Sequence, residues 1–152
     1  MKAILTITFC IFYCLGLSSQ NLNPKYDSTL AKSVGADQYG MKMYVFVILK
    51  TGKVTIENKT TRDSLFAGHL NNIKRLADQK QLYVAGPFGK NDSDFRGLFI
   101  LNVRTKEEAN KLLETDPAIK AELLKPELYL WYGSAALGEY LDASEKVGKF
   151  SM

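Results

Sequence analysis

The hydrophobic pattern divides the central part of the chain into strands and helices. Residues 43–49 form an apolar, β-rich run of strand length that ends before Gly52. Between residues 64 and 79, apolar positions instead recur every three or four residues, which is typical of an amphipathic helix. Three further strand-like runs and a second helical region over about 105–114 follow; the runs are QLYVAGP (81–87), RGLFILNV (96–103) and ELYLWY (127–132).

Capping patterns predict where the helices begin. Asp63 is the expected N-cap of the first main helix, because its side chain can accept from free amides of the first turn. Thr105 and Glu108 have the spacing of a capping box at the start of the second. Asp116 followed by Pro117 resembles an N-cap with proline at the first helical position, which predicts a further short helical turn.

The order β-α-β-β-α-β predicts an α+β fold of the ferredoxin-like type, with an antiparallel sheet and helices on one face. The other face should then be polar, yet in the first, third and last strands the residues that point to either face of the sheet are apolar. A surface of that size is rarely left in water. We therefore expect a homodimer in which two sheets pack together as a dimeric α+β barrel. Cover by the C-terminal tail or by the N-terminal segment is the alternative.

The N-terminus has the pattern of a cleaved secretory signal peptide over residues 1–19. Lys2 precedes an apolar run over 3–17, and small residues follow. The run is too short for a permanent membrane span, so we expect export, either periplasmic or secreted, with a membrane anchor as the minority alternative. The rest divides into an N-terminal extension (20–40), a folded domain (41–132) and a C-terminal tail (133–152).

Composition excludes several classes of site. The chain has 20 basic and 16 acidic residues, and the excess of +4 is scattered, which argues against nucleic-acid binding. Its two cysteines, Cys10 and Cys14, both lie within the predicted signal peptide, so the mature protein has no disulfide and no thiolate nucleophile. With a single histidine left, a zinc site of the usual kind is not expected. We predict no cofactor and no metal.

His69 is the only histidine, and it falls within the apolar arc of the first main helix, beside Leu65, Ile73 and Leu76. Two interpretations are open. It is either a neutral core histidine with satisfied ring nitrogens, or an acid–base group facing a cleft between helix and sheet. Asp116 is the carboxylate to test as its partner. An N-cap role for Asp116 is compatible with that function, because capping amides keep a carboxylate ionised and fixed in direction.

Three further residues are weaker candidates for ligand binding. Gly86 would allow backbone amides to approach a small ligand, although Gly86-Pro87 is most simply the end of a strand. Arg96 follows a polar loop and could contact an anionic group. The loop itself lacks the later glutamate that a calcium loop requires.

The ordered segments YVFVILK, HLNNIKRL, LYVAGPF, RGLFILNV, TDPAIKAELL and ELYLWY resemble the YciI-like (YCII-related) domain family, over about residues 43–132. The flanking segments GMKMYVFVILK and LWYGSAAL are similar to an exported branch. The resemblance implies a ferredoxin-like fold, a dimeric α+β barrel and an active site formed by His69 and Asp116. It also implies acid–base elimination or isomerisation of small molecules in some branches.

Three functions follow as expectations. The first is a small cofactor-free enzyme in which His69 is the general base or acid and Asp116 orients it. The second is a non-catalytic, ligand-binding dimer that uses the same pocket. The third is a structural or interaction module in which His69 only packs. The sequence names no substrate.

Overall fold

The computed structural model describes residues 23–149, so the predicted signal peptide, with Cys10 and Cys14, lies outside the described residues. The four strands are β1 (Met41–Thr51), β2 (Leu82–Pro87), β3 (Phe95–Leu101) and β4 (Leu124–Ser134). The helices are α1 (Ser28–Ser33), α2 (Lys59–Asp78), α3 (Lys106–Leu113), α4 (Pro117–Lys120), the 3-10 helix η1 (Ala135–Glu139) and α5 (Tyr140–Val147).

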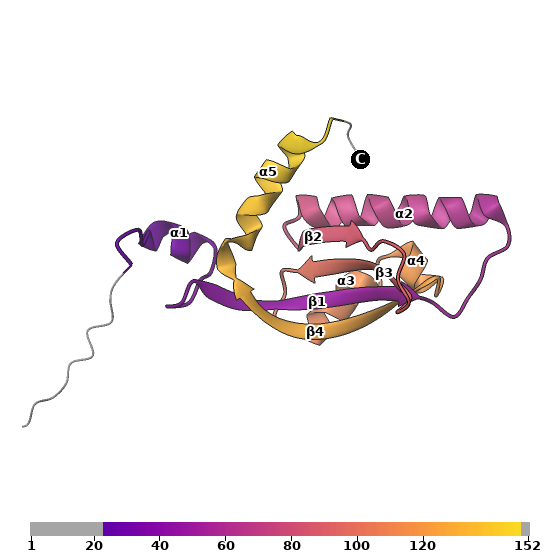
Figure 1. The fold of residues 1–152 in the computed structure, drawn as a ribbon, viewed down its shortest axis with the longest axis horizontal. Helices are drawn as coiled ribbons and strands as arrows, with labels where there is room; N and C mark the ends of the chain where they lie inside the picture. The colour runs from indigo at the N-terminus through magenta and orange to yellow at the C-terminus, as the bar shows by residue number, and fades with distance from the viewer. Residues whose placement is uncertain (1–22, 150–152) are drawn as a thin grey trace, which may run out of the picture.

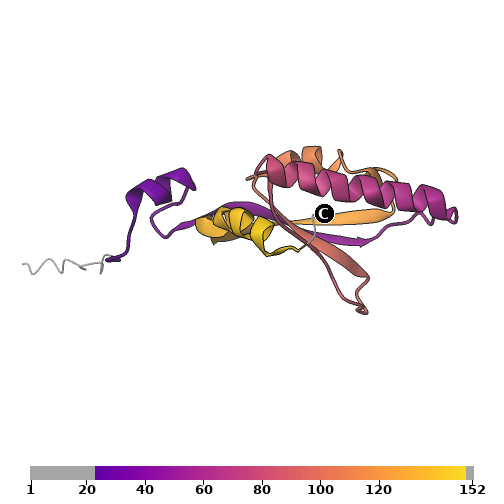
Figure 2. The same ribbon diagram turned by 90° about the horizontal axis from the view of Figure 1, so that it is seen from above.

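The strands form one antiparallel sheet in the order β2-β3-β1-β4. The two central strands, β1 and β3, each begin a crossover, through α2 and through α3 with α4, that returns to an edge of the sheet. Figures 1 and 2 show that α2, α3 and α4 lie on the same side of the sheet. This is the ferredoxin-like α+β arrangement, and the predicted fold class is confirmed.

The hydrophobic core lies between the sheet and these three helices. Strand β1 contributes every second residue to it (Val45, Val47 and Leu49), as expected for a strand whose successive side chains point to opposite faces. Leu76 from α2 and Leu113 from α3 close the core from the helix side. All five side chains are almost completely removed from water, so this layer supplies most of the hydrophobic stabilisation of the fold.

The opposite face of the sheet, which we call the open face, is also apolar. The register pairs Tyr44 with Trp131 and Phe46 with Tyr129 on this face. Tyr129 and Trp131 are 48% and 37% exposed. The tail covers only one end: a Cβ at Gly138 would lie 2.9 Å from the Tyr83 ring. Beyond that contact, α5 rises away from the end of β4 (Figure 1).

The start of α2 differs from the prediction. The N-cap is Asn58, whose side chain accepts a hydrogen bond from the amide of Thr61 at 3.0 Å. Asp63 lies one turn inside the helix and forms an ion pair with Lys59, so its prediction as the N-cap is wrong. The first turn of α2 is exposed or half-buried, and it therefore lacks the apolar periodicity that would have marked it as helical.

The other capping predictions are confirmed. Thr105 and Glu108 form both bonds of the capping box of α3, and Asp116 caps α4. Strand β4 begins before Pro126 rather than after it, because an edge strand tolerates a residue without an amide donor.

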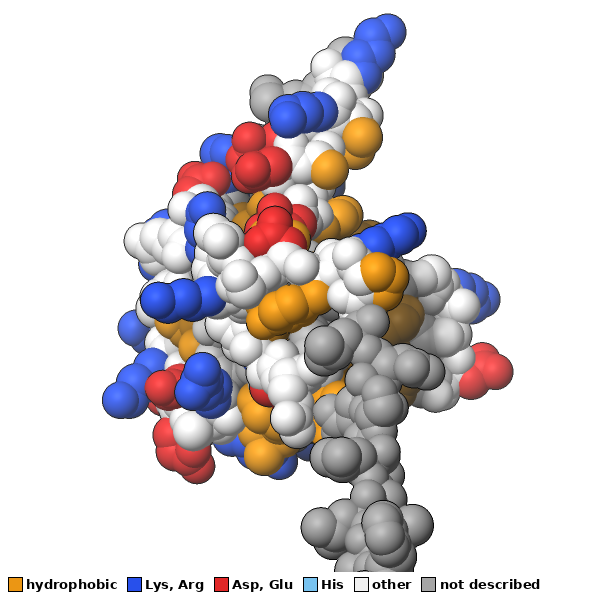
Figure 3. All heavy atoms as spheres, turned by 90° about the vertical axis from the view of Figure 1, so that its left-hand side faces the viewer, with side chains coloured by type: hydrophobic (Ala, Val, Ile, Leu, Met, Phe, Trp, Pro, Cys, Tyr) orange, Lys and Arg blue, Asp and Glu red, His pale blue; other side chains and the backbone are white. Residues whose placement is uncertain are grey.

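The surface of the described residues carries both signs of charge. Figure 3 shows Lys and Arg side chains beside Asp and Glu side chains over the end of the molecule that bears α5. This view therefore presents no surface of a single sign, in line with the scattered charge of the sequence. Within residues 23–149, none of the helices combines the length and the hydropathy needed to cross a membrane.

Candidate functional site

His69 lies in the middle of α2 and points toward the sheet. Its side chain is 11% exposed. The imidazole stacks on Phe99 of β3, with ring centroids 5.9 Å apart and an interplanar angle of 24°, and meets the edge of Phe66 at 6.3 Å. The two aromatic rings restrict how the imidazole can rotate, so its two nitrogens have defined directions.

Asp116 is completely buried, and it contacts His69 directly. Its Oδ2 atom lies 2.6 Å from Nδ1 of His69. Its other oxygen, Oδ1, accepts hydrogen bonds from the amides of Ala118 at 2.9 Å and Ile119 at 3.3 Å. The carboxylate is therefore both the N-cap of α4 and the partner of the imidazole, so the two roles considered for Asp116 coexist in one side chain.

A close approach of α2 to α4 makes this contact possible. A Cβ atom at Gly68 would lie 2.9 Å from Cγ of Pro117, which follows Asp116 directly. Real Cβ atoms are not found at that distance, so a larger residue at position 68 would separate the two helices. Sequence analysis missed this residue; a glycine inside an otherwise regular helical pattern was the available signal.

One turn further along α2, a hydrogen-bond network connects this helix to the residue before Asp116. The buried side chain of Asn72 accepts through Oδ1 from Nη2 of Arg75 at 2.7 Å and from Oγ1 of Thr115 at 3.0 Å. Arg75 also donates to Thr115 at 2.8 Å. Because Thr115 precedes Asp116, this network fixes the position of the carboxylate relative to His69. Sequence analysis did not identify any of the three residues.

The contact determines which nitrogen of His69 is available for chemistry. A carboxylate only accepts hydrogen bonds, so the proton of a neutral imidazole is assigned to Nδ1. Nε2 forms no hydrogen bond with another described residue. Since the described residues contain no buried side-chain nitrogen or oxygen without a partner, Nε2 is not sealed inside the fold and keeps a small solvent-exposed area. With the proton of the neutral imidazole on Nδ1, Nε2 carries a lone pair that can accept a proton or a hydrogen bond.

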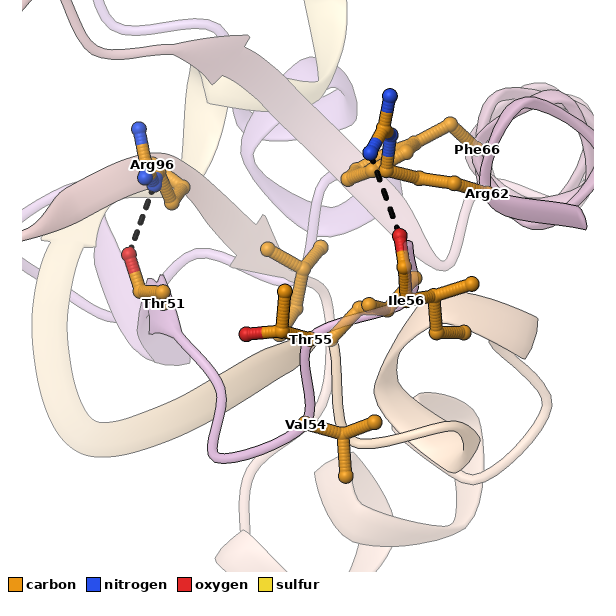
Figure 4. Close-up of a pocket in the computed structure, with 9 residues that line it drawn as sticks. Thr51, Val54, Thr55, Ile56, Arg62, Phe66 and Arg96 are labelled. Carbon is orange, nitrogen blue, oxygen red and sulfur yellow. Dashed lines mark hydrogen bonds between the residues drawn. The ribbon is translucent and has the colours of Figure 1, made fainter. Parts of the chain in front are cut away.

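A pocket of about 460 Å³ adjoins this site at one end of the sheet. Figure 4 shows Phe66 and Arg62 of α2 on one side, Arg96 of β3 on the other, and the loop after β1 between them. His69 is not among the lining residues. Phe66 connects the two features, because it lines the pocket and also contacts the imidazole edge-on.

The model of the YCII-related domain matches residues 43–128, more than half of the chain. The protein belongs to the YCII-related domain family. The matched region extends from β1 into β4 and includes both His69 and Asp116. A search of curated proteins found no match.

One solved structure similar to this YCII-related chain is 5-chloro-2-hydroxyhydroquinone dehydrochlorinase from Burkholderia phenoliruptrix AC1100, in complex with 2,5-dihydroxybenzoquinone. The two are 24% identical, with a TM-score of 0.40, over 57% of this chain and 92% of the other. This likeness is too distant to inform the chemistry of the site.

The three weaker candidates for ligand binding in this YCII-related protein do not lie together in the structure. Arg96 lines the pocket, whereas Gly86 and Pro87 are not among its lining residues. Gly86 and Pro87 form the end of β2 and pair with Leu98 and Gly97 of β3. A Cβ at Gly97 would lie 3.0 Å from the carbonyl oxygen of Gly86, so this corner serves close strand packing.

Residues 23–149 contain no group of three or more His, Cys, Asp or Glu side chains placed to hold a metal ion. That no cofactor takes part stays a prediction.

Proposed function

We propose that this YCII-related protein is a small enzyme that uses His69 and Asp116 for acid–base chemistry on a small organic molecule. One observation carries the proposal: a buried carboxylate, already held by two amides, binds Nδ1 of a histidine whose Nε2 stays accessible. A histidine that only packed would be expected to have both nitrogens satisfied inside the protein.

The arrangement supports proton transfer at Nε2. Asp116 holds the imidazole in the tautomer that leaves the Nε2 lone pair free, so Nε2 can take a proton from a substrate atom. The imidazolium formed in this way gains from the carboxylate 2.6 Å from Nδ1, which is shielded from water. Return of the proton to another atom of the substrate gives isomerisation. Departure of a leaving group with the electron pair of its bond gives elimination, and the imidazolium then gives its proton to the leaving group or to water.

The alternative is a protein that binds a small molecule in the same place without changing it. The pocket beside Phe66 is the observation that favours this function, because it lies next to His69 without including it. The two functions differ in the fate of the ligand, which is altered by an enzyme and recovered unchanged from a binding protein.

A screen of the mature protein against a mixture of small metabolites tests the proposal. We expect mass spectrometry to show at least one compound that wild type converts. His69→Gln should slow that conversion by roughly 10²- to 10⁴-fold, the range of general acid–base catalysis. If His69→Gln converts the compound as fast as wild type, the enzyme proposal is wrong. A compound that binds wild type and is recovered unaltered, with weaker binding to His69→Gln, identifies the binding function.

The state of the mature protein is part of the same proposal. We propose that it is exported by a cleaved signal peptide and forms a homodimer through the open face of the sheet. The half-exposed side chains of Tyr129 and Trp131 support the dimer. Intact mass after secretion tests cleavage near residue 18, and light scattering of Trp131→Glu tests the dimer. A Trp131→Glu variant that keeps the mass of wild type in solution would contradict it.

A further inference from the structure

The pocket beside Phe66 combines an apolar wall with two arginines. Val54, Ile56 and Phe66, together with Leu123 and Leu124, form its apolar surface. Arg62 and Arg96 stand on opposite sides of it (Figure 4). The volume of about 460 Å³ falls within the range of about 300–1,000 Å³ that is usual for small-molecule sites.

Neither arginine is paired with an acidic side chain of the described residues. Arg62 donates from Nη1 to the carbonyl oxygen of Ile56 at 3.2 Å, and Arg96 donates from Nε to Oγ1 of Thr51 at 2.8 Å. These two bonds tie one nitrogen of each guanidinium to a residue that lines the pocket. They leave the other guanidinium N–H groups without a partner among residues 23–149.

This combination selects a class of ligand. A guanidinium has a planar set of donors that matches the two oxygens of a carboxylate. The apolar wall would hold a compact hydrocarbon or aromatic group. A small organic acid satisfies both requirements, whereas a neutral compound leaves the arginines unpaired and a strongly hydrophilic anion leaves the apolar wall unused.

We propose that this pocket binds a small organic acid, with its carboxylate on the guanidinium of Arg62 or of Arg96 and its apolar part against Phe66. The inference rests on the proposed function, since it makes this acid the substrate of the His69 site. The link is Phe66, whose ring forms part of the pocket and lies 6.3 Å from the imidazole. An acid held in this pocket would therefore contact the same phenylalanine as the histidine.

The test is binding of benzoate, phenylacetate and hexanoate to the full mature protein by calorimetry, each compared with its neutral primary amide. We expect at least one acid to bind saturably and its amide to bind at least about tenfold more weakly, as expected when a charge-assisted hydrogen bond is lost. Binding of the acid should also weaken with added salt. If no acid binds, or if acid and amide bind equally well, the inference is wrong.

Variants then locate the binding. Arg62→Gln or Arg96→Gln should weaken binding of the acid by roughly tenfold, which identifies the arginine that holds the carboxylate, and Arg104→Gln, an exposed arginine outside this pocket, should leave it unchanged. If Arg62→Gln lowers the melting temperature, Arg62→Lys replaces it, because lysine keeps the positive charge. Thr51→Val removes the hydrogen bond to Arg96 without removing the charge of that arginine. Binding that is insensitive to both Arg→Gln changes overturns the inference.

His69→Gln separates this inference from the proposed function. If binding depends on the arginines while turnover is indifferent to His69→Gln, the pocket stands and the enzyme proposal fails. If turnover requires His69 while binding ignores both arginines, the enzyme proposal stands and the pocket inference fails.

Discussion

Two buried polar contacts join distant parts of this chain, and they differ in what they leave accessible. Tyr44 of β1 is completely buried, and its hydroxyl donates to the carbonyl oxygen of Ser134 at 2.8 Å, between the rings of Tyr83 and Trp131. His69 contacts Asp116 at 2.6 Å, but its second ring nitrogen is reachable from outside. The first contact is complete within the fold. The second leaves Nε2 of His69 without a partner among the described residues, and it is this nitrogen that the proposed function uses.

The largest expected difference between the two contacts is in turnover. Asp116→Asn retains an oxygen that can cap α4, but its amide group would donate to Nδ1 of His69 and move the imidazole proton to Nε2. The lone pair needed for proton abstraction is then lost, and we expect turnover of the compound found by screening to fall by roughly 10²- to 10⁴-fold. Tyr44→Phe should leave turnover unchanged. Steady-state kinetics of both variants decide this, and equal losses would remove the distinction.

The next effect is on stability. Asp116→Ala removes the cap of α4 and leaves the Nδ1–H of His69 without an acceptor, so we expect it to lower the free energy of unfolding by about 2–4 kcal/mol. Asp27→Ala is the matched control, because Asp27 also accepts from two amides at a helix start but is exposed and has no histidine partner. That variant should lose about 1 kcal/mol or less.

A double variant separates stability from chemistry at the same place. His69→Leu with Asp116→Ser removes the buried polar pair while serine still caps α4, and we expect it to unfold within about 1 kcal/mol of wild type and to be inactive. Urea unfolding measures this. A double variant as unstable as Asp116→Ala would mean that the fold itself requires the pair.

Most of the fold could be predicted because buried residues recur at a different spacing in strands than in helices. The strand runs and the capping box at Thr105 gave the order of elements without any contact being known. Prediction failed at the start of α2 and at the start of β4. The first turn of α2 is exposed or half-buried, so nothing but the side-chain bond of Asn58 shows where the helix starts. The length of β4 depends on its position at the edge of the sheet, and local sequence does not specify that position.

The two main residues of the candidate site could be predicted, but the residues that hold them in place and the adjoining pocket could not. His69 stands out as the only histidine and as a polar residue in an apolar arc, and resemblance to the family supplied Asp116 as its partner. Asn72 is buried although its residue type favours a solvent-facing position, because Arg75, three residues later in α2, and Thr115, which is distant in sequence, satisfy its side-chain oxygen. The pocket depends on the path of the loop after β1, which hydrophobic periodicity does not determine.

The network behind Asp116 should have a smaller effect on turnover than the pair itself. Asn72→Ala removes the acceptor shared by Arg75 and Thr115, so the carboxylate is held less firmly opposite His69, and we expect kcat to fall by about tenfold with KM unchanged. Asn72→Asp keeps the acceptor and should restore much of the rate. Asn71→Ala, at the exposed neighbouring position, is the control. A decrease in melting temperature without a change in kcat would make Asn72 structural, as Tyr44 is.

The smallest effect concerns Tyr44 and depends on pH. Tyr44→Phe removes one buried hydrogen bond, and near neutral pH we expect the free energy of unfolding to fall by about 1 kcal/mol. Burial, with a smaller contribution from Tyr83, raises the pKa of Tyr44 to about 12, above the value of about 10 for an unfolded tyrosine. The folded state therefore keeps a proton that the unfolded state loses between about pH 10 and 12, and the stability contributed by the hydroxyl is present below pH 10 and declines through this window. Phenylalanine has no such proton. The difference in unfolding free energy between wild type and Tyr44→Phe should thus be constant from pH 7 to 9 and shrink above pH 10, as urea unfolding at each pH would show. A difference that stayed constant to pH 12 would mean that the Tyr44 hydroxyl is not shut inside the fold, and the contrast with the accessible Nε2 of His69 would be lost.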